Sequence, residues 1–397
     1  MTEKKIVVIT SYPERGSIHG QKTVGLASYT KNTLLAIKNL DKSLQIVVLA
    51  EILKKPEEYQ EKGILIKRIW RKGKIIDIFK ILWQVRESKT NVILVPFEAY
   101  MFGSLPKIVP FLALFFLFKL SGKKIYFILH QIIEDFEKFE ENKFKAKLLN
   151  LTKNVFYRLL LLISAKAIVF EEKFKRILGD NEKIVTIPHA VEKQKLMNKR
   201  LARKKLGLSQ KNFYVLYFGF LSPYKGADFL VKAWKNVRGA KLILAGGGNP
   251  NHMADKKYAR FVKNLISEAK KMGVLTPGFV AEEEIPIYFS AADLFILPYK
   301  VFISSSGPLS FAFGYDKPTL LSQPLKGYSE SKDMKQALNE AHLEVNDLLF
   351  TLSKKDLAKK IFWARKNENR KRLAQFSRLM KEKRDWSKIS KKYLEIL

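Results

Sequence analysis

The chain has 397 residues, of which 47 % are hydrophobic, and a formal net charge of +35. This length allows two or three domains with large cores and excludes a globally disordered protein, while the absence of cysteine excludes disulfides, thiolate metal sites and cysteine nucleophiles. The basic excess predicts an attraction to polyanions, namely nucleic acid, anionic lipid or phosphorylated substrates.

The first half of the chain alternates apolar strands with helical patterns. The first apolar run, residues 6–10, is too short for the core of a signal peptide, so we expect a first strand and a cytoplasmic protein. Continuous apolar strands separated by helices indicate a parallel sheet covered on both faces. The expected strands are 6–10, 45–50, 64–68, 92–95, 124–129, 167–170 and 184–187, with helices that include 25–38 and 75–87.

The longest apolar run covers residues 108–118 and contains four phenylalanines. It is too short to span a bilayer as a helix, which needs about 20 residues. Two interpretations stay open: a helix buried in a large core, or a helix that dips into one leaflet with basic residues at its edge. Residues 155–170 could enlarge the same apolar surface.

A polar, basic segment, residues 192–211, separates the first half from a second alternation of strands and helices. Two consecutive doubly wound domains place a ligand cleft between the carboxyl ends of their strands. We expect strands at 214–218, 241–245, 274–279 and 294–297, and helices at 227–237, 258–272 and 283–291. The last residues, from 372 onwards, form an amphipathic helical pattern.

The stretch YFGFLSPYKGADFLVKAW, residues 217–234, opens as a strand and closes as a helix. Between the two lie Lys225 and Gly226. A helix amino terminus presents unpaired N–H groups and a partial positive charge, which attract phosphate. Because Gly226 allows a close backbone approach and Lys225 adds a full charge, this turn predicts a phosphate-binding site.

Two later strand ends carry similar turns. KLILAGGGNP ends in Gly246, Gly247 and Gly248, and a glycine followed by Phe279 and Val280 precedes an acidic helix start. Their order resembles the carboxy-terminal domain of GT-B glycosyltransferases, specifically the family 4 group, over about residues 210–325. The resemblance implies that Lys225 binds a donor diphosphate and that the other turns surround the nucleotide. The implied donor-binding residues in these turns are Gly219, Lys225, Gly226, Gly247, Gly248, Phe279 and Val280.

The loop before residues 316–321 departs from the common family pattern. The two glutamates usual there are replaced by Ile303 and Phe311, which cannot accept a hydrogen bond from a sugar hydroxyl. The chain resembles a branch with a Ser-Gly loop instead. That resemblance implies that Ser304, Ser305, Ser306 and Gly307 hold donor phosphate or sugar at a helix amino terminus. The alternative is a degenerate, inactive site.

The first domain offers further candidates. The glycine-containing loop after the first strand would face the phosphates and the acceptor. His130 ends a buried strand at the position of the family's cleft histidine, where it would contact the transferred sugar. His189 at the domain edge and Glu98 at a strand end are possible additional site residues. The loop candidates are Arg15, Gly16, Gly20 and Gly25.

These inferences combine into one prediction. The fold is α/β of the GT-B type, with Rossmann-like domains at 1–200 (acceptor) and 201–375 (nucleotide sugar) and a helix at 376–397 that returns to the first domain. Lys225 and His130 are the expected catalytic residues of a hexosyl transfer from a nucleotide diphosphate sugar, without a metal or other cofactor. A lipid-linked or glycolipid acceptor and an anionic membrane surface are the expected partners, with the protein peripheral to the inner face of the membrane. The alternatives are an epimerase-like GT-B enzyme and a basic nucleic-acid-binding protein, although no nucleic-acid-binding motif is evident.

Overall fold

A computed structural model describes residues 4–18, 25–98, 101–103, 107–138, 140, 142–250 and 252–397. The chain divides into two compact units. The first comprises Met1–Pro188, Ile303–Ser305 and Trp386–Leu397. The second comprises His189–Phe302 and Ser306–Asp385. The main divisions fall after Pro188 and Asp385. The sequence predicts them after residues 200 and 375 instead.

The first unit contains an eight-stranded sheet in the order β3-β4-β2-β1-β5-β6-β7-β8. Its strands are parallel except β3, which pairs antiparallel with β4 through a two-residue turn in which both residues have positive φ, Lys62 and Gly63. This hairpin was not predicted. The strands are β1 (Lys5–Thr10), β2 (Gln45–Glu51), β3 (Glu57–Glu61), β4 (Ile64–Trp70), β5 (Val92–Phe97), β6 (Lys124–Leu129), β7 (Lys166–Val169) and β8 (Ile184–Thr186).

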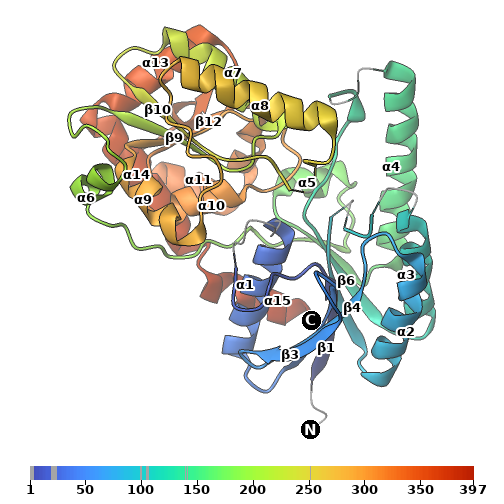
Figure 1. The fold of residues 1–397 in the computed structure, drawn as a ribbon. Coiled ribbons are helices and arrows are strands. Elements are labelled where there is room, and N and C mark those ends of the chain that lie inside the picture. The colour runs from blue at the N-terminus through green and yellow to red at the C-terminus, as the bar shows by residue number, and fades with distance from the viewer. Residues whose placement is uncertain are drawn as a thin grey trace. The chain divides into compact units, whose positions relative to one another are not determined.

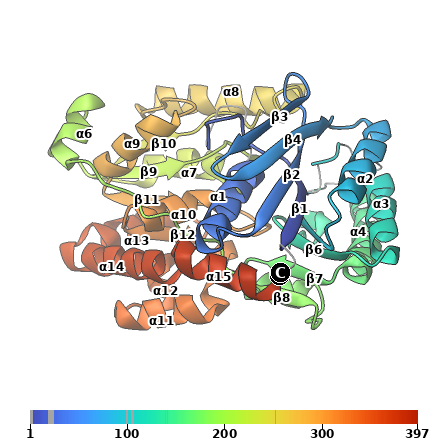
Figure 2. The same cartoon turned by 90° about the horizontal axis from the view of Figure 1, so that it is seen from below.

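Helices cover both faces of this sheet, as its continuous apolar strands require. Helices α1 (Gly25–Leu40) and α15 (Trp386–Ile396) lie side by side on one face. Helices α2 (Ile78–Glu87), α3 (Ile108–Leu120) and α4 (Lys143–Ile163) lie on the opposite side (Figures 1 and 2). A short helix, α5 (Glu172–Ile177), follows β7.

The carboxy-terminal helix α15 belongs to the first unit, which confirms the expected return of the chain. Its Tyr393 is fully buried, and the Tyr393 hydroxyl lies 3.2 Å from the hydroxyl of Tyr29 on α1. The ring of Trp386 lies 5.4 Å from that of Tyr29. Aromatic packing against α1 therefore fixes the end of the chain.

The second unit contains a five-stranded parallel sheet in the order β10-β9-β11-β12-β13. This is a doubly wound order whose direction reverses between β9 and β11, the position at which such sheets bind ligands beyond the strand ends. The strands are β9 (Tyr214–Phe218), β10 (Lys241–Ala245), β11 (Leu294–Leu297), β12 (Thr319–Ser322) and β13 (Leu349–Phe350). Two parallel α/β units confirm the predicted fold class.

Nine helices belong to the described part of the second unit. They are α6 (Lys199–Lys205), α7 (Ala227–Ala233), α8 (Lys256–Lys271), α9 (Ile285–Ala291), α10 (Gly307–Gly314), α11 (Lys332–Glu340), α12 (Val345–Leu348), α13 (Lys354–Arg365) and α14 (Asn367–Lys383). The strand expected at 274–279 is wrong, because only an isolated bridge joins Leu275 to Ile243. Pro277 has no N–H to donate and Gly278 has a φ of +80°, so the segment cannot continue a ladder.

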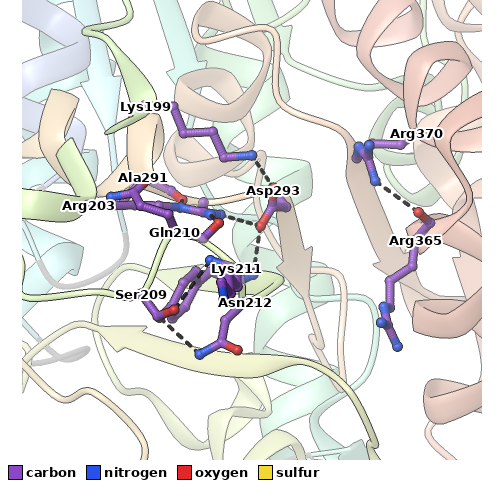
Figure 3. Close-up of polar contacts among 12 residues, drawn as sticks. Lys199, Arg203, Ser209, Gln210, Lys211, Asn212, Ala291, Asp293, Arg365 and Arg370 are labelled. Carbon is purple, nitrogen blue, oxygen red and sulfur yellow. Dashed lines mark hydrogen bonds and ion pairs between the residues drawn. The ribbon is translucent and has the colours of Figure 1, made fainter. Parts of the chain in front are cut away.

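A buried ion cluster fastens α6 to the amino ends of β9 and β11 (Figure 3). The Asp293 carboxylate accepts hydrogen bonds from Arg203 Nη2 at 2.6 Å and from the backbone N–H of Tyr214 at 2.7 Å, and it also pairs with Lys199. Arg203 is 3 % exposed and donates to the carbonyls of Ala291 and Gln210 as well. Because every partner is hydrogen-bonded, this cluster is structural. It lies at the amino ends of the strands, whereas the glycine turns follow their carboxyl ends.

Candidate functional site

The site in the second unit is built from backbone that only glycine allows. Gly219 follows β9 with a φ of +124°, and a Cβ at that position would lie 3.0 Å from Pro308 at the start of α10. A Cβ on Gly246, after β10, would lie 2.0 Å from the Gly219 carbonyl oxygen. The Gly219 N–H donates to Ala245 at 3.0 Å. The ends of β9 and β10 therefore meet through bare backbone, and the Pro308 ring at the start of α10 packs against Gly219.

Lys225 lies on the turn that leads from this point into α7. It ends a short 3₁₀ helix, and Gly226 follows with a φ of +71°. A Cβ on Gly226 would lie 1.9 Å from the carbonyl oxygen of Pro298, just after β11. The turn is thus packed against a third strand end, and only glycine fits at its apex.

The side chain of Lys225 is oriented by aromatic rings. Its Nζ lies 5.8 to 6.0 Å from the ring centroids of Phe220, Tyr224 and Tyr299. The same atom lies 3.8 Å from the position that a Cβ would take on Gly219. An ammonium group at a strand end, beside a glycine that leaves space for a ligand, can bind an anionic phosphate.

The second glycine turn lies next to the segment that carries Phe279. A Cβ on Gly247 would lie 3.3 Å from the backbone nitrogen of Phe279, and one on Gly248 would lie 2.2 Å from Met253 Sδ. Phe279 is 36 % exposed, whereas Val280 is buried. The structure therefore brings Gly247 and Phe279 together, as their order in the chain predicted.

Ser306 has a local structural role. Its Oγ accepts a hydrogen bond from the Leu309 N–H at 3.2 Å and so caps α10, and it also lies 3.0 Å from the Tyr299 hydroxyl. Pro308 has no N–H, so the first turn of α10 presents its amide at Gly307 rather than a full set of donors. A Cβ on Gly307 would meet no atom within 4 Å. Within the predicted loop, Gly307 is thus the group best placed to meet a ligand.

The other two serines of that loop belong to the first unit. Ser305 Oγ donates to the fully buried carboxylate of Glu171 at 2.9 Å. The Ile303 carbonyl oxygen accepts from the Ile132 N–H at 2.8 Å. Ser304 is partly exposed between them. No sequence pattern indicated that Glu171 would contact this loop, because Ser305 lies 134 positions away in the chain.

His189 pairs with α10 in the second unit. Its Nδ1 lies 2.8 Å from Ser310 Oγ and 3.0 Å from the carbonyl oxygen of Ala190. Burial lowers the pKa of His189 to about 4, so the ring is neutral at pH 7. A neutral imidazole next to this helix can position Ser310, but it is a poor general acid near neutral pH.

His130 and Glu98 lie at neighbouring strand ends of the first unit. β5 and β6 pair through Phe97 and Leu129, and the two candidates directly follow these residues. Glu98 Oε1 accepts a hydrogen bond from Gln131 Nε2 at 2.8 Å. The His130 ring contacts the rings of Tyr29 and Phe170 edge-on, at 5.3 and 4.9 Å. The packing of these rings holds His130 at the carboxyl edge of the sheet.

The loop after β1 is anchored to the unpredicted β3 hairpin. The Gly16 N–H donates to Glu61 Oε1 at 3.0 Å, and the same oxygen pairs with the buried Lys31 at 2.8 Å. The Arg15 guanidinium lies 5.2 Å from the Tyr59 ring centroid. These partners come from β3 and α1, so the sequence order of the loop did not indicate them.

A buried arginine holds the start of the same loop. Arg68 is 2 % exposed and donates to the carbonyls of Tyr12 and Pro13 and to the Tyr59 hydroxyl. Gly25 begins α1 and is exposed, whereas Gly20 lies outside the described residues. Within the described part of the chain, no group of three His, Cys, Asp or Glu side chains could hold a metal ion. Among those residues, too, no helix combines the length and apolarity that a membrane crossing needs.

Comparisons with known proteins show a partial family match and a shared fold. Residues 198–383 match the family model described as Glycosyl transferases group 1. Sucrose-phosphate synthase from Thermosynechococcus elongatus is 14 % identical, with a TM-score of 0.75 over 99 % of this chain and 98 % of that one. HepE of Anabaena, solved with UDP-glucose, is 17 % identical, with a TM-score of 0.69 over 98 % of both chains.

A curated relative in Xanthomonas campestris pv. campestris is named GDP-mannose:glycolipid 4-beta-D-mannosyltransferase. It is 30 % identical over 106 residues, which cover 27 % of this chain and 29 % of that protein. The chain thus aligns with less than a third of the length of this relative. The family match and the structural neighbours confirm the resemblance to GT-B glycosyltransferases.

Proposed function

We propose that this chain is a glycosyltransferase that moves a hexosyl unit from a nucleotide diphosphate sugar to an acceptor hydroxyl. The observation that carries the proposal is the position of the Lys225 ammonium beside Gly219, where the ends of β9 and β10 present bare backbone. As the glycosidic bond to the donor breaks, negative charge develops on the diphosphate. A fixed cation and backbone N–H groups stabilise that charge, which is often the largest contribution to catalysis.

The donor contacts follow from the same geometry. The diphosphate would lie against Lys225, with the Gly307 amide at the start of α10 as a further donor. The nucleoside would lie near Gly247 and the partly exposed ring of Phe279. Two comparisons support a nucleotide sugar: HepE was solved with UDP-glucose, and the Xanthomonas relative is named for GDP-mannose. We propose that no metal is required.

His130 and Glu98 are the first-unit residues that we assign to the transferred sugar and the acceptor. Both follow paired strands directly, so they lie at one edge of the sheet. A histidine there can hydrogen-bond a sugar hydroxyl or relay a proton near neutral pH. We place the acceptor in the class of lipid-linked sugars or glycolipids, which the name of the Xanthomonas relative supports. The protein would then work at the cytoplasmic side of a membrane.

A ligand screen followed by product analysis tests this function. In a thermal-shift assay, UDP, GDP and their sugars are offered to the full chain, and a ligand at 100-fold over its Kd stabilises by about 2.7 kcal/mol. The ligand that binds is then incubated with a glycolipid extract. Transfer of labelled sugar to the lipid phase supports the proposal. Release of an epimerised nucleotide sugar without transfer, or no stabilisation by any nucleotide, would overturn it.

A further inference from the structure

We propose that an exposed apolar face formed by α2, α3 and α4 of the first unit docks the protein onto an anionic lipid membrane. This inference rests on surface residues of the first unit, whereas the glycine turns belong to the second, and it does not depend on the transfer activity. Large exposed apolar side chains are normal on a protein surface when they are scattered singly. Here they are gathered on three neighbouring helices.

Helix α4 provides the longest part of this apolar face. The exposed residues are spaced by three or four positions, which places them along one line of the helix. They extend over 18 positions and thus about 27 Å, at 1.5 Å per residue. They are Phe144, Leu148, Leu151, Val155, Leu159 and Leu162, each between 43 and 80 % exposed. An ordinary surface helix would present polar residues along this line.

Helix α3 is apolar on both of its faces. Phe111 and Phe115 are buried against the unit, whereas Phe116, Leu117 and Leu120 are 42 to 69 % exposed. Both sequence interpretations of residues 108–118 therefore describe part of the helix. Packing in the core explains the apolar side chains on the buried face. It does not explain those on the exposed face.

Helix α2 and the turn before it continue the apolar face. Ile76, Phe79 and Trp83 recur at helical spacing and are 64, 65 and 61 % exposed. The side chains that this helix buries are Ile81 and Val85, on its other side. The sequence did not single out this helix, because its pattern is that of an ordinary amphipathic helix. Only the structure shows that these apolar side chains are exposed.

The three helices are neighbours in the structure. Helix α3 contacts both α2 and α4, and all three lie together in both views (Figures 1 and 2). Lys119 Nζ on α3 donates to the Leu162 carbonyl oxygen at the end of α4, at 2.5 Å. The exposed apolar side chains therefore come from adjoining helices, and such a concentration of them marks an interaction site.

The charge around this face identifies its partner. Helices α3 and α4 contain no Asp or Glu, and the only acidic residue of α2 is Glu87. Lys143, Lys147 and Arg158 are exposed on α4 near the apolar line. A second copy of the chain would bring like charges together, whereas anionic headgroups attract them. An interfacial helix that combines apolar and basic residues in this way suits a lipid surface.

Co-sedimentation of the full chain with vesicles tests the proposal without donor or acceptor. Vesicles of phosphatidylcholine alone are compared with vesicles that contain phosphatidylglycerol, at low and high salt. We expect binding to the anionic vesicles that weakens with salt. Replacing Lys147 and Arg158 by Gln should weaken binding roughly five-fold for each charge removed. The variant Lys225→Ala should bind vesicles like the parent, which separates docking from the proposed catalysis.

An apolar variant and a matched control complete the test. Leu148→Gln, Leu151→Gln and Val155→Gln replace side chains that are at least half exposed, so the fold should persist. The triple variant should bind anionic vesicles at least about ten-fold more weakly. The control, Leu201→Gln with Phe362→Gln, changes side chains of the second unit that are 57 and 63 % exposed, and it should bind like the parent.

Three outcomes would overturn the proposal. They are absence of binding to anionic vesicles, unchanged binding of the triple variant, and a dimer in solution that the triple variant converts to monomer. Trp83 adds a depth measurement, because its emission should shift to the blue on vesicles and be quenched by brominated lipid. The substitution Trp83→Phe should remove this signal, since Trp70 and Trp234 are buried, Trp363 and Trp386 are half-buried, and none of these four lies on α2, α3 or α4. A signal that persists in Trp83→Phe would place α2 outside the docking surface.

Discussion

The Nζ of Lys225 lies 3.8 Å from the point that a Cβ would occupy on Gly219. The two residues are separated by a turn that begins at the end of β9 and returns the chain over the same strand end. Gly219 has no side chain to fill the space beside the ammonium, which is bordered by the Pro308 ring and by the rings of Phe220, Tyr224 and Tyr299. A diphosphate bound there would meet the cation without a side chain at Gly219 in its way.

Replacing Lys225 by Ala should lower kcat/KM for sugar transfer by about 10²–10³-fold, because the charge that develops on the leaving diphosphate loses its cation. The measurement is transfer of labelled sugar at limiting donor concentration. Lys232→Ala removes an exposed lysine from α7, the helix that follows, and serves as the control with unchanged kinetics. Equal rates for the two variants would refute the role of Lys225.

Gly226→Ala should destabilise the second unit and also reduce donor binding. The new Cβ would lie 1.9 Å from the Pro298 carbonyl oxygen, so the turn that carries Lys225 must move. Gly273→Ala is the matched control, because Gly273 has a similar φ of +69° and open space around it. We expect Gly226→Ala to cost roughly 2 kcal/mol more in urea unfolding than the control. A similar loss in both variants would mean that the contact with Pro298 yields easily.

Asp293→Ala should destabilise the protein by about 3–5 kcal/mol, because it leaves the buried Arg203 guanidinium without its carboxylate. The measurement is the free energy of unfolding in urea. Asp228→Ala, which removes the surface ion pair with Lys300 at 2.7 Å, should cost only about 0–1 kcal/mol. If both variants lose the same stability, the cluster in Figure 3 does not fasten α6 as described.

Lys317 should give the protein a distinct alkaline stability profile. Burial, with a smaller effect from the neighbouring Lys199, lowers its pKa to about 8, and its Nζ donates to the Ala292 carbonyl oxygen. Between pH 8 and the pKa of about 10.4 of the unfolded chain, the unfolded state binds more protons. Stability therefore rises with pH there, by up to about 1.4 kcal/mol per unit.

Comparison with Lys317→Met isolates this contribution from those of other titrating groups. Urea unfolding at pH 7 to 10 should show that the stability of the parent increases relative to the variant above pH 8. A constant difference between the two proteins across this range would contradict the depressed pKa.

Several features of the site were predictable because they depend on local chain properties. The end of β9, the glycines after β10 and the apex at Gly226 all follow from apolar strands that stop at residues with special backbone freedom. The positions of His130 and Glu98 follow from the ends of paired strands in the same way.

Ser306 shows where local pattern is ambiguous. A serine before a helix can cap the helix or bind a ligand, and the sequence pattern is the same in both cases. The hydrogen bonds to Leu309 and Tyr299 assign it to the cap. The strand predicted at 274–279 is also a case of ambiguous local pattern. Its apolar start favours a strand, but Pro277 and Gly278 end the pairing after a single bridge.

The amino-acid sequence by itself determined the alternation of strands and helices, the parallel sheets and the glycine-lined strand ends, because periodicity and backbone freedom act within a few residues. Tertiary structure alone decided which distant groups meet: Glu61 with Gly16, Glu171 with Ser305, and Asp293 with Arg203. It also decided which apolar side chains of α2, α3 and α4 remain in water. Hydrophobic patterning specifies that a side chain favours burial, but only packing specifies whether the fold has a place to bury it.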